Sequence, residues 1–198
     1  PGFLNFNMSK ETWFIFLIQL LETNLLFNEE IGLNKNINVE YVSANPTGPL
    51  HIGHCRGAVF GDVLSNLLKV TGHNVTKEYY INDAGTQIDT LANSTIIRIK
   101  EIINSKSEEN YPDEFYPGEY LIDVAKKIID KHGTSILEND NHFSTIKGEC
   151  VNLLLENIKE DLSKLSINQD IFVSEKELIT QGKIDKTIDE LKNMNLIY

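Results

Sequence analysis

The chain has 198 residues, 41% of them apolar and 24% charged, a balance typical of a globular protein with one sizeable core. Its formal net charge of −11 argues against a protein that binds nucleic acid over its whole surface. No apolar run approaches the roughly 20 residues that span a bilayer, and nothing resembles a signal peptide. Cys55 and Cys150 form no CxxC pair, so we expect neither a disulfide framework nor a structural metal. Together these features predict a cytoplasmic protein without membrane contact.

The first elements alternate between helix and strand patterns. Residues 10–28 place apolar side chains at helical spacing, and polar interruptions of this apolar run predict a buried helix rather than a membrane span. Residues 37–42 alternate in strand fashion. The segment SANPTGPL then ends the strand, because Pro46 and Pro49 cannot continue its ladder of hydrogen bonds.

The remaining elements complete a parallel arrangement. A helix is predicted over about 53–71, with Gly72 as its stop, followed by a strand over 74–81, the polar loop NDAGTQ and a helix over 87–103. A loop over 105–118, helices near 119–132 and 143–165, a strand at 170–174 and a helix over 183–193 follow. The order strand–helix–strand–helix is that of βαβ units, so the predicted fold class is α/β with a parallel sheet.

The stretch PTGPLHIGH connects the first predicted strand to the helix that follows it. Ligands of open parallel sheets bind beyond the carboxyl ends of the strands, and a helix N-terminus attracts phosphate. His51 and His54 share one side of the first turn, and each offers an N–H donor to a phosphate oxygen. A pair that merely caps the helix is the alternative. The flanking prolines and glycines favour the phosphate site.

HIGH is also the signature of class I aminoacyl-tRNA synthetases, and EYVSANPTGPLHIGHCRGAVFGD followed by EYYINDAGTQ resembles the bacterial type of arginyl-tRNA synthetase. PGFLNF resembles the end of that family's N-terminal add-on domain, and DIFVSEKEL with GKIDKTIDELKNMNLIY resembles the middle of its catalytic domain. The resemblance implies the first half of a Rossmann-like catalytic domain with an inserted helical region. It divides the chain into the add-on tail (1–9), the first half of the nucleotide-binding domain (10–104), the helical insertion (105–168) and a continuation of the catalytic domain (169–198).

The resemblance implies ATP-dependent activation of L-arginine to arginyl-adenylate and its transfer to tRNA(Arg), with Mg²⁺ accompanying ATP. His51 and His54 would be the catalytic residues. The residues implied for ATP are Pro49, His51, Gly53, His54, Gly57 and Gly61, and those implied for arginine are Glu40, Ser43, Asn45, Asp83, Gln87 and Glu175. A carboxylate such as that of Glu40 suits this role because it forms strong bidentate pairs with a planar guanidinium.

The sequence departs from the family pattern in two respects. Nothing after Gln87 resembles KMSKS, the second class I signature, and NMSKE at 7–11 precedes HIGH and is taken as coincidence. The anticodon-binding helical domain is also absent. These departures predict a truncated chain that stops at Tyr198, binds tRNA weakly because most contacts lie in missing regions, and does not aminoacylate by itself. The resemblance, not these departures, implies a monomer.

Other interpretations remain open. A HIGH-type nucleotidyltransferase would suit the length, although it has no need of Glu40, SANPTGPL or NDAGTQ. A cysteinyl or glutamyl synthetase is a further option, and the lack of a zinc-ligand cysteine set disfavours the cysteinyl type. A synthetase-like module without catalytic activity is the third. Selective stabilisation of the folded chain by arginine would favour the arginyl synthetase. Stabilisation by ATP alone would favour the nucleotidyltransferase.

Overall fold

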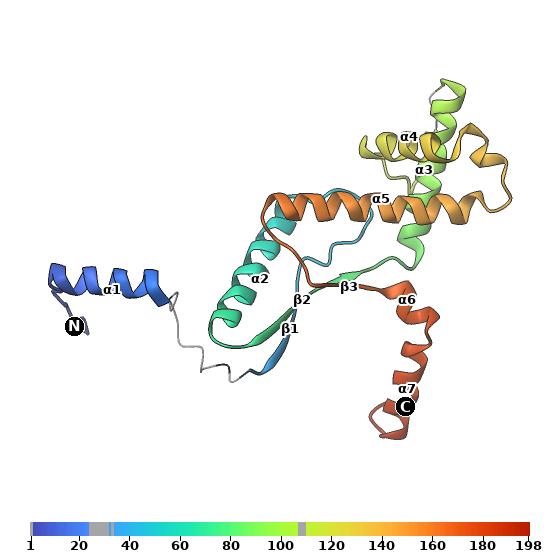
Figure 1. The fold of residues 1–198 in the computed structure, drawn as a ribbon. Coiled ribbons are helices and arrows are strands. Elements are labelled where there is room, and N and C mark those ends of the chain that lie inside the picture. Colours follow the sequence, from blue (N-terminus) through green and yellow to red (C-terminus); the bar gives the residue numbers. More distant parts are fainter. Residues whose placement is uncertain (1, 24–31, 33, 107–109) are drawn as a thin grey trace.

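The computed structural model describes residues 2–23, 32, 34–106 and 110–198. Its elements are α1 (Lys10–Thr23), β1 (Asn36–Glu40), α2 (Ile52–Val70), β2 (Asn74–Ile81), α3 (Thr86–Asn104), α4 (Tyr120–His132), the 3₁₀ helix η1 (Thr134–Glu138), α5 (His142–Lys164), β3 (Ile171–Ser174), α6 (Glu175–Thr180) and α7 (Lys183–Asn193) (Figure 1). The sequence patterns predicted all of them except η1 and α6.

The three strands form one parallel sheet in the order β1-β2-β3. Glu40 pairs with Glu78, and Tyr79 pairs with Phe172. This sheet confirms the predicted α/β, Rossmann-like fold class. Because the strands are parallel, their carboxyl ends meet at one edge, where the loop over 41–51, the NDAGTQ loop and α6 begin. The end of α2 lies at the opposite edge, since the Asn34 N–H donates to the Gly72 carbonyl oxygen at 3.0 Å. The N-terminus of α2 therefore lies at the carboxyl edge.

Helices α3, α4 and α5 pack together around an apolar core, which we call the helical cluster (Figure 1). On α4, Leu121, Val124, Ala125 and Ile128 are all buried, which is the spacing of a single inward helix face. Cys150 lies in this core, where burial raises the pKa of its thiol to about 11, so it is an inert packing residue. Cys55 and Cys150 are both free.

The sheet buries one face against α2 and α5. Alternation along β2 buries Lys77, Tyr79 and Ile81 on this covered face, while Glu78 and Tyr80 project from the other and are half-buried. The covered face packs in a second core formed by Tyr41, Ala58, Tyr79, Ile81, Ile158, Leu162 and Ile167. Glu40 shares the open face with Glu78, because paired residues of parallel strands point the same way.

Two apolar helix surfaces lie open to solvent. The described part of the predicted helix over 10–28 is α1, and the expectation that it is buried is wrong: Trp13 is 55% and Leu21 86% exposed. Residues 24–28 of that prediction lie outside the described residues. The outer side of α2, including Val59, Phe60 and Val63, lines an open apolar depression of about 790 Å³. None of the described helices is long and apolar enough to cross a membrane.

Candidate functional site

The two histidines of HIGH cap α2. His51 is the N-cap residue, and its Nδ1 accepts a hydrogen bond from the Gly53 N–H at 3.1 Å. The Nδ1 of His54 accepts from the His51 N–H at 3.3 Å, which completes a reciprocal capping box. The imidazole rings stack with centroids 3.8 Å apart. The capping role that the sequence left as an alternative is therefore present in this structure.

Capping also determines which ring nitrogen of each histidine can donate a hydrogen bond to a ligand. Since both Nδ1 atoms accept hydrogen bonds, the proton of each neutral imidazole lies on Nε2, where it is free to be donated outward. Burial, and then the neighbouring His51, hold the pKa of His54 below its ordinary value of 6.5, so His54 is neutral at pH 7. The start of α2 thus combines free helical N–H groups with two imidazole donors, an arrangement suited to phosphate.

The predicted ATP residues differ in accessibility. Pro49, Gly53 and Gly57 are exposed, and a Cβ at Gly57 would meet no atom within 4 Å. Gly61 is buried beneath Tyr41, because a Cβ there would lie 2.3 Å from the Cγ of that ring. This contact explains the glycine at position 61 through helix–strand packing, and places it away from the exposed surface on which the other three lie.

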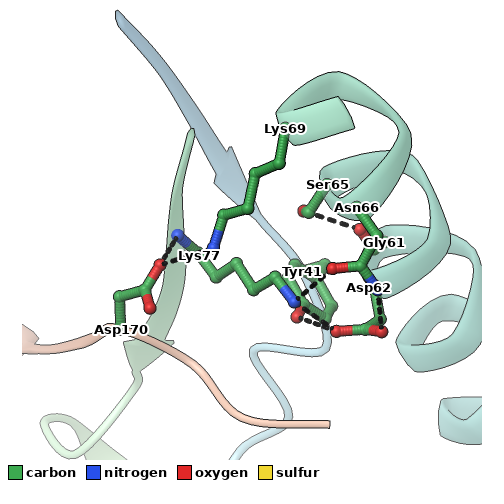
Figure 2. A network of polar contacts seen from close by, with 8 residues as sticks. All are labelled: Tyr41, Gly61, Asp62, Ser65, Asn66, Lys69, Lys77 and Asp170. Carbon is green, nitrogen blue, oxygen red and sulfur yellow. Dashed lines mark hydrogen bonds and ion pairs between the residues drawn. The ribbon is translucent and has the colours of Figure 1, made fainter. Parts of the chain in front are cut away.

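A polar network holds α2 against the sheet (Figure 2). The buried Lys77 on β2 donates to the Oδ1 of Asp62 at 2.7 Å and to the Oδ1 of Asn66 at 3.0 Å. The hydroxyl of Tyr41 donates to the same Asp62 oxygen at 3.2 Å, and burial together with Asp62 raises the pKa of Tyr41. On its other side, the Lys77 backbone N–H donates to Asp170 at 2.8 Å. The network connects α2 to β2, to Tyr41 directly after β1 and to Asp170 directly before β3, and so holds α2 in one orientation on the sheet.

Glu40 and Ser43 form the second part of the site. The backbone turns sharply after β1, with left-handed φ angles of 67° at Val42 and 40° at Ser43. A left-handed backbone is unusual for a β-branched residue such as valine, and strain of this kind clusters at functional sites. The turn lets the Ser43 hydroxyl donate to Glu40 Oε1 at 2.7 Å and accept from the Tyr80 N–H at 3.1 Å. Because of this turn, β1 ends at Glu40 and not at the predicted residue 42.

Two further pairings hold the loops at the same edge. The Asn45 amide donates to Gln87 Oε1 at 2.8 Å, and the Asn82 amide donates to Asn45 Oδ1 at 3.1 Å. Asp83 accepts from the Ser174 hydroxyl at 2.6 Å and from the Lys176 N–H at 2.9 Å.

Asp83 therefore ties the β2 end to the start of α6, where Glu175 is the first residue. The structure brings Glu40 together with Ser43, Asn45 with Gln87, and Asp83 next to Glu175. Within the described part of the chain, no hydrogen bond joins the histidine pair to these groups.

Comparison with known proteins gives this site a family. Residues 17–198 match the family model described as tRNA synthetases class I (R), catalytic domain. The chain belongs to this family. Proteins named arginine–tRNA ligase are 45% identical to it in Rickettsia bellii and 50% identical in Wolbachia pipientis from Culex pipiens. Each match covers 100% of this chain, and the chain spans about a third, 34%, of each relative.

Solved structures agree with this family. An arginyl-tRNA synthetase structure from Campylobacter jejuni aligns with a TM-score of 0.83 and 38% identity, over 96% of this chain and 42% of that one. A Thermus thermophilus arginyl-tRNA synthetase aligns with a TM-score of 0.56 and 21% identity, over 97% of this chain and 31% of that one. The second likeness supports the fold alone.

Sequence reasoning missed several residues at this candidate site. Tyr80 lies two residues beyond Glu78 on β2 and so belongs on the same open face, a signal that the strand pattern already contained. Ser174 caps α6 by accepting from the Glu177 N–H at 3.0 Å, and S-x-x-E in SEKE is a capping-box pattern that predicts this helix. The hydroxyl of Tyr120 donates to the Thr47 carbonyl, which no local pattern indicates. Among the described residues, no group of three or more His, Cys, Asp or Glu could hold a metal ion.

Proposed function

We propose that the chain supplies the ATP and arginine sites of an arginine–tRNA ligase, which activates L-arginine to arginyl-adenylate and transfers it to tRNA(Arg). The observation that carries this proposal is the histidine-capped start of α2 at the same sheet edge as the Glu40–Ser43 pair. The named relatives support the choice of arginine. They do not favour a nucleotidyltransferase, a different synthetase or a module without catalytic activity.

The α2 N-terminus would bind the phosphates of ATP. An oxygen of the arginine carboxylate attacks the α-phosphorus, the bond to the β-phosphate bridging oxygen breaks, and pyrophosphate leaves with those electrons. Negative charge grows on the phosphate oxygens during this step, and the Nε2–H groups of His51 and His54 would stabilise it. Removing one such donor typically costs about 2.7–4 kcal/mol in activation free energy. Gly53 and Gly57 would leave space for the adenine, near Pro49, and Mg²⁺ would accompany the phosphates.

The carboxyl edge of the sheet would hold the amino acid. Glu40 is exposed, and Ser43 orients its carboxylate, so it can pair with a guanidinium. The Asn45–Gln87 pair would hydrogen-bond the amino and carboxylate groups of arginine. Asp83 and Glu175 would add negative charge. The net charge of −11 suits a protein that meets tRNA(Arg) mainly through regions outside this chain, and we propose a cytoplasmic monomer.

Thermal shift measurements test the proposal directly. L-Arginine, L-ornithine and ATP are added separately to the chain. We expect arginine to raise the melting temperature and ornithine to leave it unchanged, because only arginine carries the planar guanidinium. Saturation at 100 times the dissociation constant corresponds to about 2.7 kcal/mol of stabilisation. A response to ATP alone would instead support the nucleotidyltransferase, and no response to any ligand would support the binding module.

A pair of substitutions separates the two roles in a longer ligase that contains this chain. His54→Ala should lower the rate of pyrophosphate exchange by roughly 10²–10³-fold with little change in arginine affinity. Glu40→Gln should chiefly weaken arginine binding. The opposite pattern would contradict these assignments.

A further inference from the structure

Tyr80 occupies the centre of the candidate arginine site. It lies on β2, the middle strand, and pairs with Val173 on β3. Its side chain projects from the open face, two residues beyond Glu78, which pairs with Glu40. Tyr80 therefore stands at the carboxyl edge between the end of β1 and the start of α6.

The backbone of Tyr80 is fixed while its hydroxyl is free. Its N–H donates to the Ser43 hydroxyl, which itself donates to Glu40, so two hydrogen bonds separate Tyr80 from that carboxylate. Among the described residues, no hydrogen bond engages the Tyr80 hydroxyl. The neighbouring Tyr79 differs, because its hydroxyl points to the covered face and donates to the Ala44 carbonyl at 2.7 Å. A free phenol at a ligand-binding edge can act as both donor and acceptor.

Three carboxylates from three separate segments act on the free phenol. Burial raises the pKa of Tyr80, and Glu175, Asp83 and Glu40 raise it further. Both oxygens of Asp83 are already engaged by Ser174 and Lys176, so Glu40 and Glu175 have more freedom to meet a ligand. A half-buried aromatic ring next to acidic groups is a favourable place for a cation.

We propose that Tyr80 is a specificity-determining residue of the arginine site, whose ring face and free hydroxyl receive the guanidinium while Glu40 and Glu175 balance its charge. This inference rests on the proposed function, since it requires arginine to bind at this edge. It adds a cation–π contact that favours the charged guanidinium over an uncharged group of the same shape, such as the ureido group of citrulline.

Calorimetric titration with L-arginine and with L-citrulline, which has the same shape and no charge, tests the proposal. Tyr80→Leu should weaken arginine binding roughly 5- to 30-fold, and Tyr80→Phe, which keeps the ring, by less. Citrulline should bind more weakly than arginine, with little change among the variants. Thr76→Val, on the same strand and face but toward the other end, is the matched control and should leave both affinities unchanged.

The NMR signals of ¹³C-labelled tyrosine rings provide a readout that a structural role would not change. The Tyr80 signals, identified by their loss in Tyr80→Phe, should shift with arginine and hardly with citrulline. Equal arginine affinity in Tyr80→Leu, or unmoved ring signals during arginine binding, would overturn the inference. Should Tyr80→Leu fail to fold, Tyr80→Phe and the ring signals decide. If the unchanged chain binds no arginine, the proposed function itself fails.

Discussion

The helical cluster and the sheet with α2 are held together in different ways. The cluster of α3, α4 and α5 is held by an apolar core to which all three helices contribute. The sheet buries one face only, and α2 is tied to it by the Lys77–Asp62 network as well as by apolar contacts. Apolar packing sets how strongly helices adhere, whereas hydrogen-bonded charges fix one orientation. We infer that α2 depends on a polar network because its N-terminus must point in a defined direction.

Loss of the network should give the largest effect on stability. Lys77→Ala leaves Asp62 nearly buried without its cation, and removing one partner of a buried pair typically costs about 3–5 kcal/mol. Urea unfolding measures this change. The matched control is Lys186→Ala on α7, where the lysine lies 3.9 Å from Glu190 and both side chains are well exposed. That change should cost less than about 0.5 kcal/mol. Equal costs at the two positions would contradict the role of the network.

The second largest effect on stability should come from truncation of an apolar side chain, and it should differ between the two regions. Leu121→Ala in the helical cluster, where Leu121 is fully buried, should cost about 2–5 kcal/mol. Phe60→Ala on α2 should change stability by less than about 0.5 kcal/mol, because Phe60 is 70% exposed. Thermal unfolding of both variants measures the contrast. A large loss from Phe60→Ala would show that the outer face of α2 is covered in solution.

Removal of the Ser43 hydroxyl should have a smaller effect. Ser43→Ala leaves the Tyr80 N–H without its acceptor, at a cost of about 1–3 kcal/mol, and releases Glu40. Thr187→Ala on α7 removes an exposed hydroxyl that bonds the Lys183 carbonyl within its own helix, and is the control. Denaturant unfolding gives the stability, and calorimetry with arginine should show weaker binding only for Ser43→Ala. Unchanged arginine binding would argue against the orienting role.

The smallest expected effect is that of pH on the helix cap. The pKa of His54 is lowered in the folded chain, so the unfolded state binds its proton first as the pH falls. The contribution of His54 is therefore fully present above its ordinary pKa of 6.5 and is lost as the pH falls through the lower folded value. NMR titration of His54 should give a pKa below that of an unfolded control peptide. A raised pKa would contradict a neutral His54 stacked on the ring of His51.

The site was predictable where local patterns determine it. The strand–helix junction in the sequence placed His51 and His54 at the start of a helix, where the structure has them, and β2 has the predicted bounds, Asn74–Ile81. The Val42–Ser43 turn was not predictable, because residues 37–42 alternate as a continuous strand and only tertiary hydrogen bonds reveal the reversal.

The sequence also did not show which residues far apart in the chain lie side by side. The pairing of Tyr80 with Val173 joins residues far apart in sequence, so the surroundings of Tyr80 could not be inferred from its neighbours. The exposure of α1 was missed for the same reason. An apolar helix pattern predicts that a face can be buried, and it contains no information on which partner buries it.

The central claim is that one edge of the sheet binds arginine while the start of α2 binds ATP. Amide NMR spectra of the ¹⁵N-labelled chain, recorded during titration first with L-arginine and then with ATP, test it most directly. We expect arginine to shift the signals of Ser43 and Tyr80, and ATP those of Gly53 and His54. Shifts confined to the helical cluster, or none with either ligand, would contradict the account.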